Sequence, residues 1–177
     1  DVVANYGAPG EYERVNEVVG RLDRPYAATN GNHEVVFEPY PRDHPDHGDR
    51  YDRAAPATRA ASRARFERFF GVDRFEAAVD LPAAVCLLGM DDQNERRSAL
   101  LDADHEQWFR DVLARAAGKP LVVLAHYPLV AQKLDRVTYH EEAFEPYYRP
   151  PEDVRETLRD REAPTLWMSG HLHITPR

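Results

Sequence analysis

The sequence contains a single cysteine, Cys86, which lies inside the apolar run Ala84-Val85-Cys86-Leu87-Leu88. One cysteine cannot form an internal disulfide, and it cannot build a zinc site of several thiolates. Because its neighbours are all apolar, we predict that Cys86 packs in the hydrophobic core. Disulfide-stabilised scaffolds and cysteine-ligated zinc proteins are therefore excluded as models for this chain.

The sequence also lacks a long apolar run and a leader. No run approaches the roughly 18 apolar residues of a membrane span, and a hydrophobic share of 42% with a charged share of 31% is typical of a globular protein. The chain opens at Asp1 without a start methionine or a signal-peptide pattern. We expect a single domain over residues 1–177 that is truncated at both ends. We also expect a cytoplasmic location.

Positive charge is in the minority. Acidic residues outnumber basic ones by 31 to 23, which gives a net charge of −8. A protein of this charge is a poor general partner for a nucleic-acid backbone, because that contact depends on lysine and arginine. We therefore expect a small phosphate-containing partner, such as a nucleotide, to be held by local groups, and we regard a nucleic-acid polymer as an unlikely partner.

Apolar periodicity predicts helices and strands in alternation. Helices are predicted over residues 9–22, 60–70, 104–117 and 152–161, and strands over residues 25–29, 75–81, 84–90, 120–125 and 164–168. Residues 37–57 and 130–151 have no period and are predicted to be long loops. This alternation indicates an α/β layered fold, in which ligands gather at the ends of strands.

Three short polar clusters each follow a predicted strand: Gly31-Asn32-His33-Glu34, then Ala125-His126-Tyr127-Pro128, then Gly170-His171-Leu172-His173. Imidazole and amide groups that come together from strand ends can bind metal. Such ligands suit Mn, Fe, Zn, Co or Ni, and the ligand types do not decide among these ions. Gly31 and Gly170 allow tight backbone turns beside the candidate ligands.

The three clusters, in this order, resemble the metal-binding motifs of the calcineurin-like metallophosphoesterase superfamily, and in particular its bacterial phosphodiesterase-type members. The resemblance implies a layered β-sandwich of mixed sheets flanked by helices, in the order α-β-β-α. It also implies a metal-dependent phosphoric ester hydrolase, either a phosphodiesterase or a phosphatase. In such enzymes a hydroxide that bridges two metal ions attacks phosphorus in line with the leaving group.

The same resemblance implies a role for each candidate site residue. Asn32, His126 and His171 would hold one metal ion, His173 would help to hold the other, and Asp1 would bridge the two. His33 would not be a ligand; it would donate a proton to the leaving oxygen, with Glu34 orienting its ring.

The sequence departs from the family pattern near its start. Ala4 stands where many members have a second aspartate, and the opening Asp-x-His motif is absent, which we interpret as truncation of the chain. A plain helix-entry loop stays open as the alternative reading of the Asp1 segment. Ala4 also occupies the place of the tyrosine that purple acid phosphatases need, so we favour the broader bacterial group.

Two other functions compete with the hydrolase hypothesis. A non-catalytic partner-binding module on the same fold is the alternative, and Ala4 together with the missing Asp-x-His keeps it open. A nuclease for polymeric substrates is disfavoured by the acidic balance. For the hydrolase, side chains of the two long loops could contact a base or a phosphate. The simpler alternative is that these side chains pack locally. They are Arg42, Tyr139, Tyr147, Tyr148 and Arg149.

Overall fold

The computed structural model of the chain describes residues 10–24, 26–35, 37–39, 51–53, 55–90, 101–129, 148 and 150–170. For residues 32, 35, 37–39 and 51–53 it describes the backbone alone.

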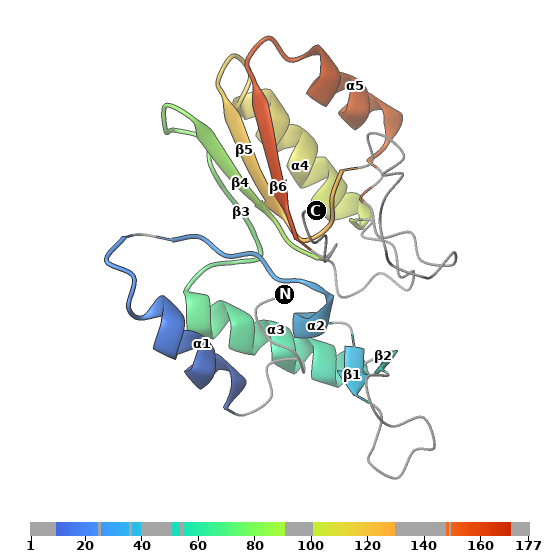
Figure 1. The fold of residues 1–177 in the computed structure, drawn as a ribbon. Coiled ribbons are helices and arrows are strands. Elements are labelled where there is room, and N and C mark those ends of the chain that lie inside the picture. Colours follow the sequence, from blue (N-terminus) through green and yellow to red (C-terminus); the bar gives the residue numbers. More distant parts are fainter. Residues whose placement is uncertain are drawn as a thin grey trace, which may run out of the picture.

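A mixed four-stranded sheet forms the centre of the larger half of the molecule (Figure 1). Its strands lie in the order β3-β4-β5-β6, with β3 antiparallel to β4 and the other three strands parallel. The strands are β3 (Phe75–Ala78), β4 (Ala84–Leu88), β5 (Leu121–Ala125) and β6 (Thr165–Ser169). Each was predicted from its apolar run, so the α/β class with a mixed sheet is confirmed.

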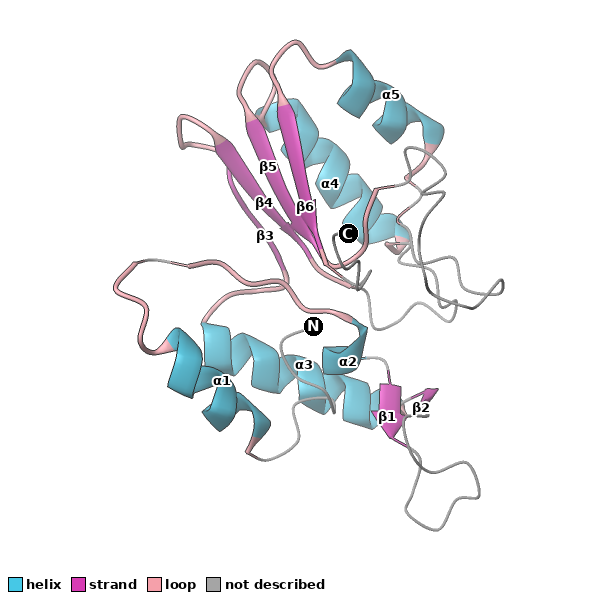
Figure 2. Ribbon diagram, in the orientation of Figure 1, coloured by secondary structure: helices cyan, strands magenta, loops and turns pink. Residues whose placement is uncertain are grey.

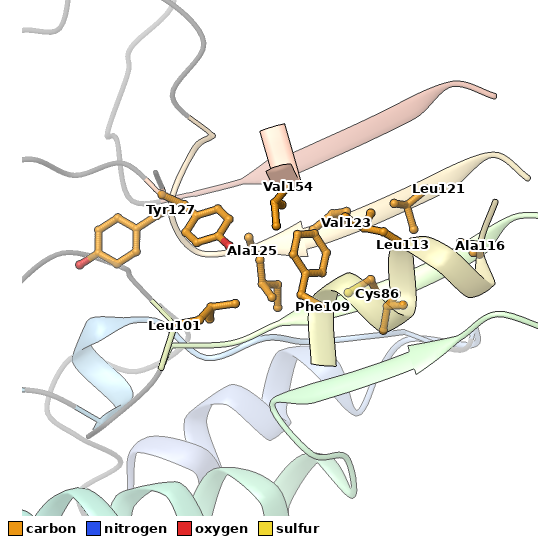
Figure 3. Packing of buried hydrophobic residues seen from close by; sticks show 14 of the residues in the cluster. Cys86, Leu101, Phe109, Leu113, Ala116, Leu121, Val123, Ala125, Tyr127 and Val154 are labelled. Atoms are coloured by element: carbon orange, nitrogen blue, oxygen red, sulfur yellow. The ribbon is translucent and has the colours of Figure 1, made fainter. Parts of the chain in front are cut away.

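Two helices cover one face of this sheet: α4 (Ala103–Arg115) and α5 (Glu152–Asp160) (Figure 2). Alternate residues of β4 and β5 point toward them and are fully buried, as the strand period of two requires. Figure 3 shows Phe109 and Leu113 of α4 against Cys86 and Val123 of the strands. Cys86 is 0% exposed, which confirms its predicted place in the core.

The start of α4 differs from the prediction. The sequence predicted a helix that begins at residue 104, but α4 begins at Ala103 and its N-cap is Asp102, whose Oδ1 accepts the backbone N–H of His105 at 2.8 Å. Asp102 also lies 3.0 Å from the His105 ring, which stacks on Phe75. His105 is therefore half-buried structural support rather than a surface histidine.

A second, smaller core lies between α1 (Glu11–Val19) and α3 (Pro56–Phe70). Tyr12 of α1 stacks on Phe69 with ring centroids 4.9 Å apart. Helix α3 begins at Pro56, earlier than predicted, because proline suits the first helical position, and it ends at Gly71 (φ 68°) as predicted.

The first helix is shorter than the predicted range of residues 9–22, and most of its apolar side chains are not buried. Tyr12 is its buried member, whereas Val18 is 68% exposed, and Leu22, which lies beyond the helix end, is 55% exposed. The physical reason is that, among the described residues, α1 packs through Tyr12 and the partly buried Val15, while Val18 lies on its exposed side.

The α-β-β-α sandwich of two facing sheets is not seen within the described parts of the chain. The strand predicted over residues 25–29 is absent from residues 26–30, where the backbone forms no ladder. The second sheet that is present is a short antiparallel hairpin of β1 (Phe37–Pro39) and β2 (Tyr51–Arg53), inside a segment predicted to be loop. No helix among the described segments is long and apolar enough to span a membrane.

Candidate active site

The candidate site lies where the parallel strands β4, β5 and β6 end. Their carboxyl ends meet at one edge of the sheet, because parallel strands in register finish together. Gly89 directly follows β4, His126 directly follows β5, and Gly170 directly follows β6. A small pocket at this edge is lined by Leu88, Gly89, Met90, Leu101, Ala125, His126, Tyr127 and Tyr148.

His126 is the candidate metal ligand whose side chain the structure describes. It is 3% exposed, and its backbone carbonyl accepts the N–H of Gly170 at 3.1 Å. A Cβ placed on Gly170 would lie 3.9 Å from His126 Nδ1. The third motif therefore begins in contact with the imidazole of the second, as a shared metal site would require.

The first motif is anchored to the end of β4 by Asn30, the residue before Gly31. Asn30 is 0% exposed, and its Oδ1 accepts the backbone N–H of Met90 at 3.0 Å. Arg74 supports the same point, since its Nη1 donates to the Met90 carbonyl at 3.2 Å. Met90 also lines the pocket beside His126, so the segments that carry the first and second motifs meet at one edge of the sheet.

Asn32, His33 and Glu34 lie in the one-turn helix α2 (Asn32–Val35). The Glu34 carboxylate accepts the backbone N–H of Gly31, which is the glutamate half of a capping box. Ser62 of α3 donates its hydroxyl to the Glu34 carbonyl. Glu34 is 0% exposed. The Gly31 bond closes the turn on itself, and the Ser62 bond attaches the turn to α3.

The buried Glu34 acts on the tyrosine beside it. Burial raises the pKa of the Tyr12 phenol above its ordinary value, and the charge of Glu34 raises it further, while Arg65 opposes the rise. The phenol therefore stays neutral and serves as packing. Burial likewise raises the pKa of the Cys86 thiol to about 12, so this thiol is not a nucleophile at neutral pH.

Tyr148, which the sequence offered as a substrate-binding side chain, is a core residue. It is 2% exposed, and its ring stacks on Trp167 with centroids 5.8 Å apart and planes at 11°. Burial raises the pKa of both Tyr148 and Tyr127, so neither phenol ionises near neutral pH. The simpler reading, local packing, is correct for Tyr148.

The structure describes part of the predicted site. Side chains of His33, Glu34 and His126 are described, and Asn32 is described by its backbone. Asp1, His171 and His173 lie outside the described residues, as do Arg42, Tyr139, Tyr147 and Arg149. Among the side chains that are placed, no group of three or more His, Cys, Asp or Glu residues could hold a metal ion. His126 fits a ligand role, because a buried imidazole at a strand end is a common metal donor.

Sequence reasoning missed the residues that support the motif turns: Asn30, Ser62, Gly89 and Trp167. Only two of them carried a signal in the sequence. Asn30 stands directly before Gly31, and Trp167 is the one aromatic residue in the β6 run. The contact between Ser62 and Glu34 joins residues 28 positions apart, which no local pattern reveals.

A model of the calcineurin-like phosphoesterase family matches residues 1–175. Searches of curated proteins and of solved structures found no significant match. Members of this family are generally metal-dependent phosphoesterases and typically bind a dinuclear metal centre. Because this match covers nearly its whole length, the chain belongs to the calcineurin-like phosphoesterase family.

Proposed function

We propose that the protein is a phosphoric ester hydrolase, a phosphodiesterase or a phosphatase, that depends on two divalent or transition-metal ions. One observation carries the proposal: Asn30, His126 and Gly170, which belong to or adjoin three separate motifs, are tied to the same edge of the sheet. Motif residues far apart in the sequence need such a shared edge to act on one substrate.

The proposed metal ligands are Asp1, Asn32, His126, His171 and His173. When bound, the two ions would neutralise phosphate oxygens and lower the pKa of water, which supplies hydroxide as the nucleophile. The protein would contribute rigid placement of the ligands. His126 is an example, because this residue is 3% exposed and its backbone carbonyl accepts the Gly170 N–H.

The proposed proton donor to the leaving oxygen is His33. It is partly exposed on the single turn α2, whereas Glu34 is fully buried behind it. Because Glu34 is bonded to the Gly31 N–H and to Ser62, the turn that presents His33 is attached to α3. We propose that Glu34 orients the imidazole through this turn.

The proposed substrate is a small phosphate ester, such as a nucleotide. The net charge of −8 opposes a long polyanion, because each phosphate of a polymer would need its own cationic contact. Specificity would then come from side chains near the pocket edge rather than from a basic surface.

We also propose that the sheet face not covered by α4 and α5 packs against another sheet. The two sheets would then form the sandwich that the family resemblance implies. This face carries aliphatic side chains in register, with Val122 opposite Leu166 and Leu124 opposite Met168. Leu166 is 55% exposed and Met168 is 49% exposed, which is unusual for a sheet face this apolar.

A comparison of histidine variants tests the hydrolase proposal. His126→Ala is expected to lower bound metal and to abolish hydrolysis of model phosphate mono- and diesters. His33→Ala is expected to keep its metal and to lose about 100-fold or more in kcat, as removal of a general acid does. Metal content is measured by elemental analysis after dialysis, and His105→Ala is the control for loss of an imidazole elsewhere.

The outcomes separate the roles. If metal-loaded wild type hydrolyses neither ester class, the catalytic proposal fails and the non-catalytic binding module becomes the better account. If His33→Ala loses metal and activity equally, His33 is a ligand or a structural residue and not the proton donor.

A further inference from the structure

The turn that carries His126 has three consecutive backbone carbonyls with defined partners. The His126 carbonyl accepts the Gly170 N–H at 3.1 Å, and the Pro128 carbonyl accepts the Tyr148 N–H at 2.9 Å. Between them, the Tyr127 carbonyl accepts the indole Nε1–H of Trp167, also at 3.1 Å. Of these three donors, two are backbone N–H groups, and the third is the side chain of Trp167.

Trp167 reaches this carbonyl from well inside β6. In the parallel ladder it stands opposite Val123, four residues before Tyr127, and the ladder ends at the pair Ala125 and Ser169. The chain bends after Ala125, so the strand backbone no longer supplies the next donor to Tyr127. The indole N–H supplies it instead.

Two aromatic rings that also contact each other pack against the indole. Tyr148 stacks on it at 5.8 Å, and Phe109 of α4 meets it edge-on at 6.5 Å with planes at 80°. An indole has one N–H and no acceptor, so a ring fixed in this way aims its donor in one direction. The carbonyl of Tyr127, a residue 2% exposed, would lack this partner if the donor were removed.

We propose that Trp167 is a positioning residue for the His126 turn. Its N–H bond to the Tyr127 carbonyl fixes the direction in which His126 leaves β5, and so fixes His126 against Gly170. This inference rests on the proposed metal-dependent function, because ligands must be held within about 0.5 Å of their working geometry to bind an ion tightly.

The experiment is Trp167→Phe, which keeps an aromatic ring next to Tyr148 and removes the N–H. Its matched control is Trp108→Phe, the same change at the other tryptophan of the chain. Trp108 is partly buried and packs on the same core, where it contacts Phe75. Titration of the metal-free proteins with Mn²⁺ by calorimetry is expected to show about tenfold weaker binding for Trp167→Phe, as loss of one buried hydrogen bond allows. Trp108→Phe should bind as wild type does.

Amide hydrogen exchange in the metal-free proteins gives a readout that does not depend on bound metal. In Trp167→Phe, the Gly170 and Tyr148 amides are expected to exchange about tenfold faster, while the amides of Val112 and Leu113 in α4 keep their wild-type rates. Equal acceleration at all four amides would show a general loss of stability and would overturn the positioning role. Trp167→Tyr is the second variant if the phenylalanine protein does not fold.

The outcomes distinguish this inference from the proposed function. Wild type that binds none of Mn²⁺, Fe²⁺, Zn²⁺, Co²⁺ and Ni²⁺ contradicts the metal-dependent function itself. Wild type that binds Mn²⁺ with the same affinity as Trp167→Phe, with unchanged exchange at Gly170, contradicts the role of Trp167 alone.

Discussion

At the scale of single residues, the absence of a side chain at Gly89 is what allows the first motif to reach the sheet. A Cβ at this position would lie 2.5 Å from Asn30 Oδ1 and 2.7 Å from the Arg74 carbonyl oxygen. The Gly89 N–H itself donates to that carbonyl at 2.8 Å. Backbone groups therefore approach Gly89 more closely than any other residue type permits.

Gly89→Ala is expected to destabilise the protein by about 1–3 kcal/mol, because the added methyl group must displace both Asn30 and the backbone of Arg74. Urea denaturation measures the change. Gly118→Asn is the control, since nothing lies within 4 Å of a Cβ there and its φ of 76° is one that asparagine tolerates. A Gly89→Ala protein as stable as wild type would show that Asn30 is not held at this edge.

At the scale of elements, α4 and α5 are joined over the sheet by charge as well as by packing. Arg110 of α4 donates to both carboxylate oxygens of Asp153 in α5, with Nε–Oδ2 at 2.6 Å and Nη2–Oδ1 at 3.2 Å. Arg161, after α5, donates to the Ala116 and Lys119 carbonyls at 3.1 and 2.6 Å and so satisfies the end of α4. Such contacts fix how two amphipathic helices lie together.

The Arg110–Asp153 pair predicts a pH dependence. The hydrogen bond from Arg110 holds the pKa of Asp153 below its ordinary value, so the pair stabilises the fold above the unfolded-state pKa. This contribution is lost as pH falls through the lowered pKa. The thermal midpoint of Asp153→Asn is therefore expected to lie below that of wild type near neutral pH and to converge with it at about pH 2.

A double-variant cycle is the control for this prediction. In an Arg110→Met background, Asp153→Asn should have a smaller pH-dependent effect, because only the backbone N–H groups of Asp153 and Val154 then lower the pKa of the carboxylate. Added salt should shrink the wild-type difference, since Asp153 is 59% exposed and the pair is screened. A difference that grows toward acid pH would contradict the pairing.

At the scale of the whole molecule, two packed clusters are joined at the carboxyl edge of the sheet. One is the sheet with α4 and α5, and the other is the aromatic cluster between α1 and α3. The Asn30–Met90 bond joins the segment leading into α2 to the end of β4 (Figure 1). The candidate site thus lies at a junction, where ligand sites are common.

Leu166→Thr tests whether the open sheet face is covered as proposed. A second sheet over this face makes Leu166 a buried residue, and the change should then cost about 2 kcal/mol or more, while threonine keeps the strand propensity. Leu22→Thr is the matched control, because Leu22 is also 55% exposed but lies outside any sheet. Chemical denaturation of both variants gives the comparison; equal small effects would contradict the sandwich.

The amino-acid sequence alone was enough to predict the family and most elements of the four-stranded sheet and its helices. Buried parallel strands are continuous apolar runs, and α4 has a clear helical period, so local pattern and burial agree there. The three motif clusters are short and local, so they could be read in order, although only the second and third directly follow a strand. The predictions were wrong for the extent of α1 and for a strand at residues 26–30. The apolar patterns there are weak, so the structure that forms depends on which elements pack beside them.

Contacts between distant residues decided the rest. No pattern in the sequence shows that Asn30 bonds to Met90, that Ser62 holds the Glu34 turn, or that Trp167 reaches Tyr127. Tyr148 shows the same limit, since a polar-loop aromatic became core only through its stack on Trp167. Strand and helix identity follow from local periodicity, whereas the position of a site depends on side chains that meet only after the chain has folded.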